Sequence, residues 1–91
     1  MDVRDVRKAL TGKLGATEDR ATHHVFYYLE YQGQEYRGPK MSHSWRRNLD
    51  DWQIDRLKNP LLLSKEEFVS LVDCSLSKDE FFTLWARRKA S

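Results

Sequence analysis

Two histidines at the ends of neighbouring strands are the residues of this sequence best suited to chemistry. His24 begins a tyrosine-rich, β-prone run, and His43 ends the next extended segment. Antiparallel pairing brings the start of one strand near the end of the next, so the two side chains are expected to be neighbours. Imidazole groups exchange protons near neutral pH, which predicts an acid–base pair. The alternative interpretation is a pair of surface or structural histidines in a tyrosine-rich sheet.

Such a pair could cleave RNA without a metal ion, because the 2′-hydroxyl of RNA is itself a nucleophile. One group would deprotonate that hydroxyl, and the other would protonate the leaving oxygen. Cations would hold the phosphate, and aromatic rings on the face of His24 would stack an unpaired base. The predicted RNA-binding residues are Phe26, Tyr28, Lys40, Arg46 and Arg47, with Arg7 and Lys8 of the first helix. A solvated helix face is the alternative for the last two.

Metal and cysteine chemistry are weaker alternatives. Adjacent strand residues point to opposite faces, so His23 and His24 would not readily share an ion. The sequence contains no CxxC or HExxH pattern. Cys74 is expected to be a packed small residue and not a nucleophile. The sequence therefore predicts neither a metal site nor a cofactor.

An opening helix and a hairpin are expected to position the histidines. Residues 3–14 carry apolar side chains at steps of three or four, which predicts a helix ended by Gly15. The polar stretch that follows is either a short edge strand or a loop. Residues 24–31 form a strand, and Gln32-Gly33 is typical of a tight turn. Regular pairing of the return strand is expected to be interrupted at Gly38-Pro39, because proline has no N–H to donate, and an extended path resumes over residues 40–43.

Alternation along the strand predicts its core face, and helical spacing predicts the rest of the core. Three helices are expected over about residues 49–58, 65–73 and 78–90, the last two each opened by a Ser-x-x-Glu capping box. The residues expected to face the core are Val25, Tyr27, Leu29 and Tyr31 of the strand and Trp45, Trp52, Phe68, Phe81 and Trp85 of the later segments.

The length and charge of the chain indicate one soluble domain, and the order of its expected helices and strands indicates the α+β class. The 91 residues are expected to form a single domain over 1–91, with an α-β-β-β-α core at 3–59 and a helical extension at 60–91. A single cysteine and the lack of a membrane-length apolar run predict a cytoplasmic location. Residues 1–49 contain nine Lys/Arg and six Asp/Glu, against seven and eight in 50–91. A polyanion site is therefore expected in the first half.

The order of these segments resembles that of the HicA-type toxins. The resemblance rests on Val6-Arg7-Lys8-Ala9-Leu10 with Lys13-Leu14-Gly15, on Thr22-His23-His24-Val25-Phe26-Tyr27, on Ser42-His43-Ser44, and on Leu62-Leu63-Ser64-Lys65-Glu66-Glu67-Phe68. It covers about residues 3–68. Ala21-Thr22 differs from the family, in which glycine-serine or two glycines are usual. The segment from Ser64 to Ser91 extends past the usual end of the family.

The resemblance implies a double-stranded-RNA-binding-like fold, α-β-β-β-α, followed here by two short C-terminal helices. It also implies a metal-independent mRNA endoribonuclease, the toxin of a toxin–antitoxin pair, whose site a HicB-like antitoxin would cover. The family histidine corresponds to His23 or His24. We choose His24, because it alternates with core residues. Two alternatives stay open: a non-catalytic RNA- or DNA-binding module of the same fold, and an interaction or inhibitor protein from a mobile element.

Overall fold

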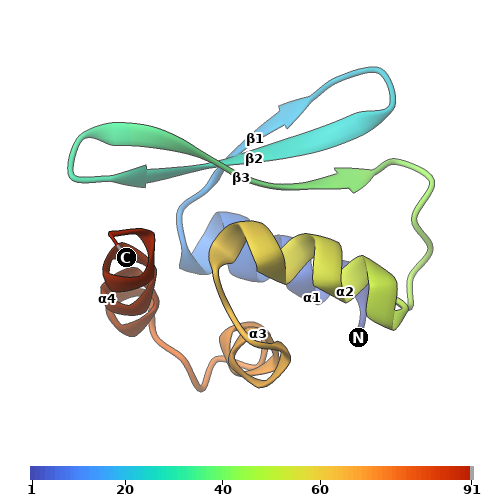
Figure 1. The fold of residues 1–91 in the computed structure, drawn as a ribbon. Helices are drawn as coiled ribbons and strands as arrows, with labels where there is room; N and C mark the ends of the chain where they lie inside the picture. Colours follow the sequence, from blue (N-terminus) through green and yellow to red (C-terminus); the bar gives the residue numbers. More distant parts are fainter. Residues whose placement is uncertain (91) are drawn as a thin grey trace.

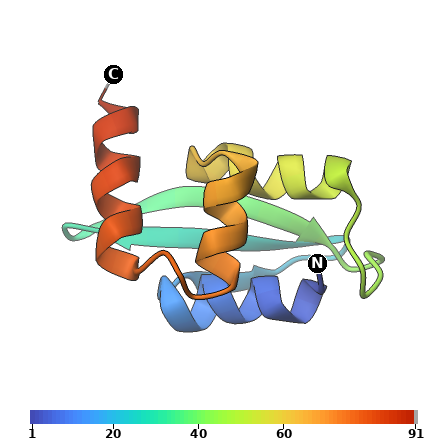
Figure 2. The same cartoon turned by 90° about the horizontal axis from the view of Figure 1, so that it is seen from below.

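The computed structural model describes residues 1–90 and has one sheet with helices on one of its faces (Figures 1 and 2). The sheet has three antiparallel strands in the order β1-β2-β3. The elements are α1 (Val3–Lys8), the π-helical η1 (Ala9–Lys13), β1 (Thr17–Arg20), β2 (His24–Tyr31), β3 (Gln34–Ser42), α2 (Asp51–Lys58), the 3-10 helix η2 (Asn59–Leu61), α3 (Lys65–Val72) and α4 (Lys78–Lys89). The predicted α+β class is confirmed.

The opening helix begins and ends where the sequence predicts. Asp2 accepts a hydrogen bond of 2.9 Å from the backbone N–H of Arg4, which caps α1. The helical path continues through η1 to Leu14, and Gly15 then takes a left-handed φ of 69°. The polar stretch after it contains the short edge strand β1, one of the two outcomes that the sequence allowed.

The two faces of β2 divide as the alternation predicts. Val25, Tyr27 and Leu29 are buried against the helices, and Tyr31 packs at the edge of the same core. His24, Phe26 and Tyr28 are half-buried on the face that the helices leave open. The tight turn at Gln32-Gly33 has positive φ at both residues, as a type I′ hairpin requires.

Regular pairing of β3 is interrupted at Gly38-Pro39, as the sequence predicts, and the interruption takes the form of a β-bulge. Phe26 of β2 pairs with Lys40, whereas Tyr28 pairs with Arg37. Two steps along β2 therefore match three steps along β3, so β3 carries one extra residue. The strand passes through Pro39 without ending.

The last helices complete the core and begin at the predicted caps. Ser64 and Ser77 each accept a hydrogen bond from the backbone N–H three residues later, and Glu67 and Glu80 reach back to them. Helix α4 lies below the far end of the β2–β3 hairpin (Figure 1). There Trp85 packs edge-on against Tyr31 and Tyr36, with ring centroids 5.5 and 4.9 Å away. Helices α3 and α4 bury Phe68, Leu71, Phe81, Phe82 and Trp85 in the same core as the sheet.

The 3-10 helix η2 carries the chain past the predicted stop at Asn59-Pro60. Leu62 then turns the chain with a left-handed φ of 59°. Across residues 1–90, no helix combines the length and the apolarity that crossing a membrane requires.

Candidate functional site

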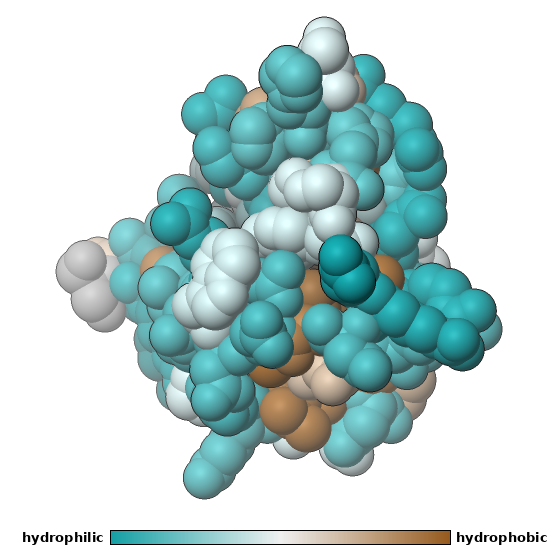
Figure 3. Space-filling view, turned by 90° about the vertical axis from the view of Figure 1, so that its right-hand side faces the viewer, coloured by the Kyte–Doolittle hydropathy of each residue, from teal (hydrophilic) through white to brown (hydrophobic). Residues whose placement is uncertain are grey.

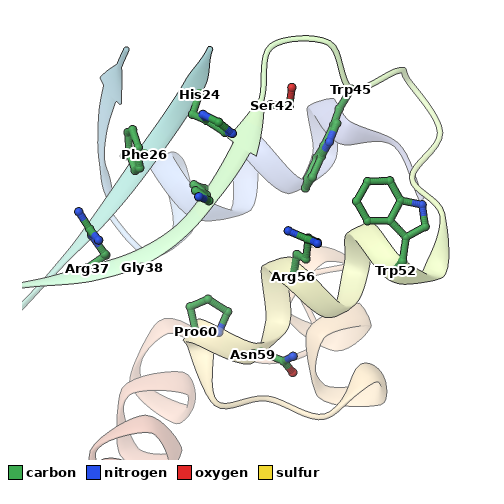
Figure 4. Close-up of a pocket in the computed structure, with 11 residues that line it drawn as sticks. His24, Phe26, Arg37, Gly38, Ser42, Trp45, Trp52, Arg56, Asn59 and Pro60 are labelled. Carbon is green, nitrogen blue, oxygen red and sulfur yellow. The ribbon is translucent and has the colours of Figure 1, made fainter. Parts of the chain in front are cut away.

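One pocket of about 640 Å³ lies between strand β3, the loop that follows it and helix α2. That volume is in the range of pockets that bind small molecules and single nucleotides. Figure 4 shows His24, Phe26 and Arg37 on the strands of the sheet, and Trp52, Arg56, Asn59 and Pro60 on and just after helix α2. The residues that line it are His24, Phe26, Arg37, Gly38, Lys40, Ser42, Trp45, Trp52, Arg56, Asn59 and Pro60.

His24 lies on the sheet side of this pocket, at the start of β2. It pairs across the sheet with Ser42, and its ring lies 6.1 Å from that of Phe26, between centroids. No hydrogen bond to the imidazole is formed within residues 1–90, and the residue is half-buried. Its ring nitrogens are therefore available to a ligand in the pocket.

The bulge in β3 places two cations beside Phe26. Arg37 and Lys40 are three residues apart, and in a regular strand an odd spacing would send their side chains to opposite faces. The extra residue at the bulge reverses the alternation, so both face the same side as Phe26. The guanidinium carbon of Arg37 lies 5.8 Å from the centroid of the Phe26 ring. A local backbone irregularity thus produces the positive wall of the pocket.

Helix α2 supplies the opposite wall. Ile54 and Leu57 fix the helix by burial in the core, which turns Trp52 and Arg56 outward. The guanidinium carbon of Arg56 lies 5.5 Å from the centroid of Trp52, one helical turn away. The indole of Trp45 meets that of Trp52 nearly at a right angle, with centroids 5.9 Å apart.

The prediction that Trp45 and Trp52 belong to the core needs correction. Trp52 is 52% exposed, and Trp45 is half-buried, with one part of it packed against the core. Their spacing matched a helical stripe, but α2 begins only at Asp51, so Trp45 belongs to the preceding loop. The expectation is correct for Phe68, Phe81 and Trp85, which are buried.

Backbone contacts hold the loop that carries Trp45. The backbone N–H of Trp45 donates to the carbonyl of Ser42 at 3.2 Å, and the Ser42 and Ser44 hydroxyls lie 2.8 Å apart. Farther along, the N–H of Leu49 donates to the Met1 carbonyl at 2.8 Å. The chain start and the loop therefore support each other, and the indole occupies a defined position.

The pocket is positive and contains no acidic side chain. Arg37, Lys40 and Arg56 line it, and Asp and Glu are absent from its lining. Within residues 1–90, none of these three cations forms an ion pair with a carboxylate. An anion that entered the pocket would meet three exposed positive charges that no carboxylate compensates.

The structure does not bring His43 into this pocket. Its Nε2 lies 2.8 Å from the carbonyl oxygen of Ala21, and its backbone N–H donates to the His23 carbonyl. The residue aligned with His24 is Ser42. His43 is one residue past the partner of His24, so the two predicted histidines have different surroundings. His23 lies in the exposed connection before β2.

Other predicted RNA-binding residues lie outside the pocket. Tyr28 is on the open face of the sheet, paired with Arg37. Arg46 is exposed on the loop, and Arg47 donates to the Asp2 carboxylate at 3.1 Å. Lys8 is exposed and borders a separate shallow hollow beside Cys74.

Arg7 belongs to a structural network between α1, β1 and β2. It donates to both carboxylate oxygens of Glu18, which also accepts a 2.7 Å hydrogen bond from Tyr27. Burial raises the pKa of Glu18, but the bond from Tyr27 and the charge of Arg7 outweigh it, so the net pKa lies below its usual value.

Cys74 is exposed, which corrects the expectation that it is packed. It has a left-handed φ of 73° in the turn after α3. Within residues 1–90, no group of three or more His, Cys, Asp or Glu side chains is arranged to hold a metal ion.

Sequence reasoning missed Arg37, Trp45, Trp52 and Arg56 as site residues. The i, i+4 spacing of Trp52 and Arg56 was a usable signal, because it places an aromatic ring and a cation on one helix face. Arg37 carried no such signal, because the bulge decides its face.

Seen from the end of the molecule that bears the loop, the surface is mostly hydrophilic, with a small hydrophobic area near its centre (Figure 3).

Comparison of the chain with protein-family models, with curated proteins and with solved structures finds no match.

Proposed function

We propose that this protein binds RNA in the pocket between β3 and α2 and cleaves it with His24 as the proton-transfer group. One observation carries the proposal: Arg37, Lys40, Arg56, three aromatic rings and a histidine without a hydrogen bond line one pocket, and no carboxylate lines it. Cations contact phosphate and aromatic rings stack on bases, so this combination matches single nucleotides better than it matches purely apolar or purely anionic ligands.

The chemistry requires no metal ion. His24 takes the proton of a ribose 2′-hydroxyl, whose oxygen attacks the adjacent phosphorus. The bond from phosphorus to the 5′-oxygen breaks, and that oxygen takes a proton from solvent. Arg37 and Lys40 on the neighbouring strand would stabilise the extra negative charge on the phosphate oxygens. The products are a 2′,3′-cyclic phosphate and a free 5′-hydroxyl.

The resemblance to HicA-type toxins supports the same proposal. That family implies a double-stranded-RNA-binding-like fold, and the α-β-β-β-α order with the helices on one sheet face agrees with it. Within the proposal, the chain is an mRNA-cleaving toxin of the cytoplasm, and a HicB-like antitoxin would bind over the pocket.

The test compares His24→Ala with His23→Ala. The two residues are adjacent, but only His24 lines the pocket, so His23 is a matched control. Purified protein is incubated with end-labelled RNA in excess EDTA. We expect His23→Ala to cleave like the wild type and His24→Ala to lose at least 100-fold in rate, the scale of general acid–base catalysis, about 10²–10⁴-fold. Equal cleavage by both variants would remove His24 from the mechanism.

A non-catalytic RNA-binding module is the second candidate, favoured by the position of His43. The pocket holds one histidine among the described residues, so it lacks the second imidazole that the sequence predicts. In this case the wild type would bind RNA with a steep salt dependence and leave it intact. Intact RNA in the EDTA assay, with binding retained, selects this candidate.

A further inference from the structure

We infer that the pocket selects single-stranded RNA by stacking one unpaired base on Trp45, with the flanking phosphates on Arg37, Lys40 and Arg56. This inference rests on the proposed RNA binding and adds to it the class of RNA. It attributes selection to the loop and to α2, which lie outside the strand that carries His24.

The indole of Trp45 stands across the pocket from the sheet. Figure 4 shows it nearly edge-on, with His24 extending toward it from β2 and Trp52 on its other side. The perpendicular contact with Trp52 supports one side of Trp45. The opposite side faces the space between Trp45 and the sheet, where a planar base fits against the ring.

The cations lie where a strand passing through this space would place its backbone. Arg37 and Lys40 extend from the sheet side, and Arg56 extends from the helix side. The two arginines already contact aromatic rings, Arg37 with Phe26 and Arg56 with Trp52. These contacts restrict the guanidinium groups before RNA arrives, which lowers the entropy cost of holding a phosphate.

A duplex cannot use this arrangement. In A-form RNA the base faces are stacked on their neighbours, and proteins read the wide, shallow minor groove with elements that protrude. Here the ring of Trp45 is half-buried beside Trp52 of α2, so a paired base would have to leave its helix to stack on it. That extrusion costs free energy for a paired base and little for an unpaired one.

Binding is measured with 2′-O-methyl RNA, which has no free 2′-hydroxyl and cannot be cleaved by the proposed mechanism. One fluorescent strand is titrated with the full-length protein, both alone and annealed to its complement. We expect the single strand to bind at least tenfold more tightly than the duplex. Trp45→Ala should weaken single-strand binding about tenfold, the scale of one base–aromatic stack, and leave duplex binding unchanged.

Two further variants keep the test decisive. Trp52→Ala removes a side chain that is 52% exposed, so it is expected to fold, and it should reduce single-strand binding by loss of support for Trp45. Val69→Ala removes an exposed apolar side chain of α3 outside the pocket and should bind as the wild type does. Equal affinity for strand and duplex, unchanged by either tryptophan variant, would overturn the inference and leave RNA binding intact. Failure to bind either RNA at low salt would overturn the proposed function as well.

Discussion

The Tyr27 hydroxyl donates a 2.7 Å hydrogen bond to Oε2 of Glu18, and this bond joins the central strand to the edge strand. Arg7 of α1 holds the same carboxylate with hydrogen bonds of 3.1 to 3.3 Å. The network fastens β1 and α1 to the strand that carries His24. It therefore stabilises the frame of the site without touching a ligand.

Tyr27→Phe is expected to lower the free energy of unfolding by about 1.5–3 kcal/mol, the usual range for a hydrogen bond to a charged group. The ring of Tyr27 is fully buried, so the phenylalanine keeps the packing and removes only the bond. Urea denaturation measures the change. Tyr28→Phe is the control, because the Tyr28 hydroxyl makes no hydrogen bond within residues 1–90. Equal effects of the two changes would contradict a special role for the Tyr27 bond.

The same network predicts a loss of stability in alkali. Burial, followed by the hydrogen bond to Glu18, raises the pKa of Tyr27 to about 12, from 10 in the unfolded chain. The folded protein thus binds this proton more tightly than the unfolded chain does. The resulting stability is complete below pH 10 and is lost as the pH rises to about 12. The stability difference between wild type and Tyr27→Phe should shrink over this interval; a constant difference would refute the assignment.

Gly38→Ala should destabilise the bulge that orients Arg37 and Lys40. A Cβ at residue 38 would lie 2.9 Å from the carbonyl oxygen of Tyr27 and 3.5 Å from Cγ of Leu29. The backbone oxygen cannot move without disturbing the sheet, so we expect a loss of about 1–3 kcal/mol. Gly12→Ala is the matched control, since a Cβ there meets no atom within 4 Å. Thermal unfolding measures the change, and a lower melting temperature for Gly12→Ala than for Gly38→Ala would contradict this account.

The junction of α3 and α4 should weaken in acid. Arg88 donates to both carboxylate oxygens of Glu67, at 2.7 and 2.8 Å. This interaction first, and the Ser64 backbone N–H second, lower the pKa of Glu67 from 4.5 to about 2. The contribution is complete above pH 4.5 and disappears as the pH falls toward 2.

Glu67→Gln tests this acid sensitivity. At neutral pH it should cost about 1 kcal/mol, as expected for a well-formed surface ion pair, and the cost should vanish near pH 2. Glu66→Gln changes the exposed neighbouring residue and should have little effect at either pH. A cost for Glu67→Gln that persists unchanged in acid would show that the ion pair is not its source.

Lys40→Ala should weaken RNA binding and reduce the slope of log affinity against log salt by about 1, the value for one lost phosphate contact. Lys8→Ala removes the same charge from an exposed position on α1, outside the pocket. It should leave the slope unchanged. Equal changes for the two variants would indicate attraction by net charge and would contradict binding in the pocket.

Local sequence determined most of the secondary structure. Capping boxes at Ser64 and Ser77 fixed the starts of α3 and α4, because the bonds that define a cap lie within four residues. Strand alternation separated His24 and Phe26 from the buried Val25 and Tyr27, because successive side chains of a strand point to opposite faces.

The tertiary structure decided which of these elements form the pocket. The bulge at residues 38–39 placed Arg37 and Lys40 on one face, and the one-residue offset after Ser42 left His43 outside. Burial of Ile54 and Leu57 turned Trp52 and Arg56 toward the sheet edge. Each outcome depends on strand register or helix rotation, which are set by packing between segments distant in the chain. Spacing along the sequence specifies neither, because the same pattern fits a stripe that faces the core and one that faces a ligand.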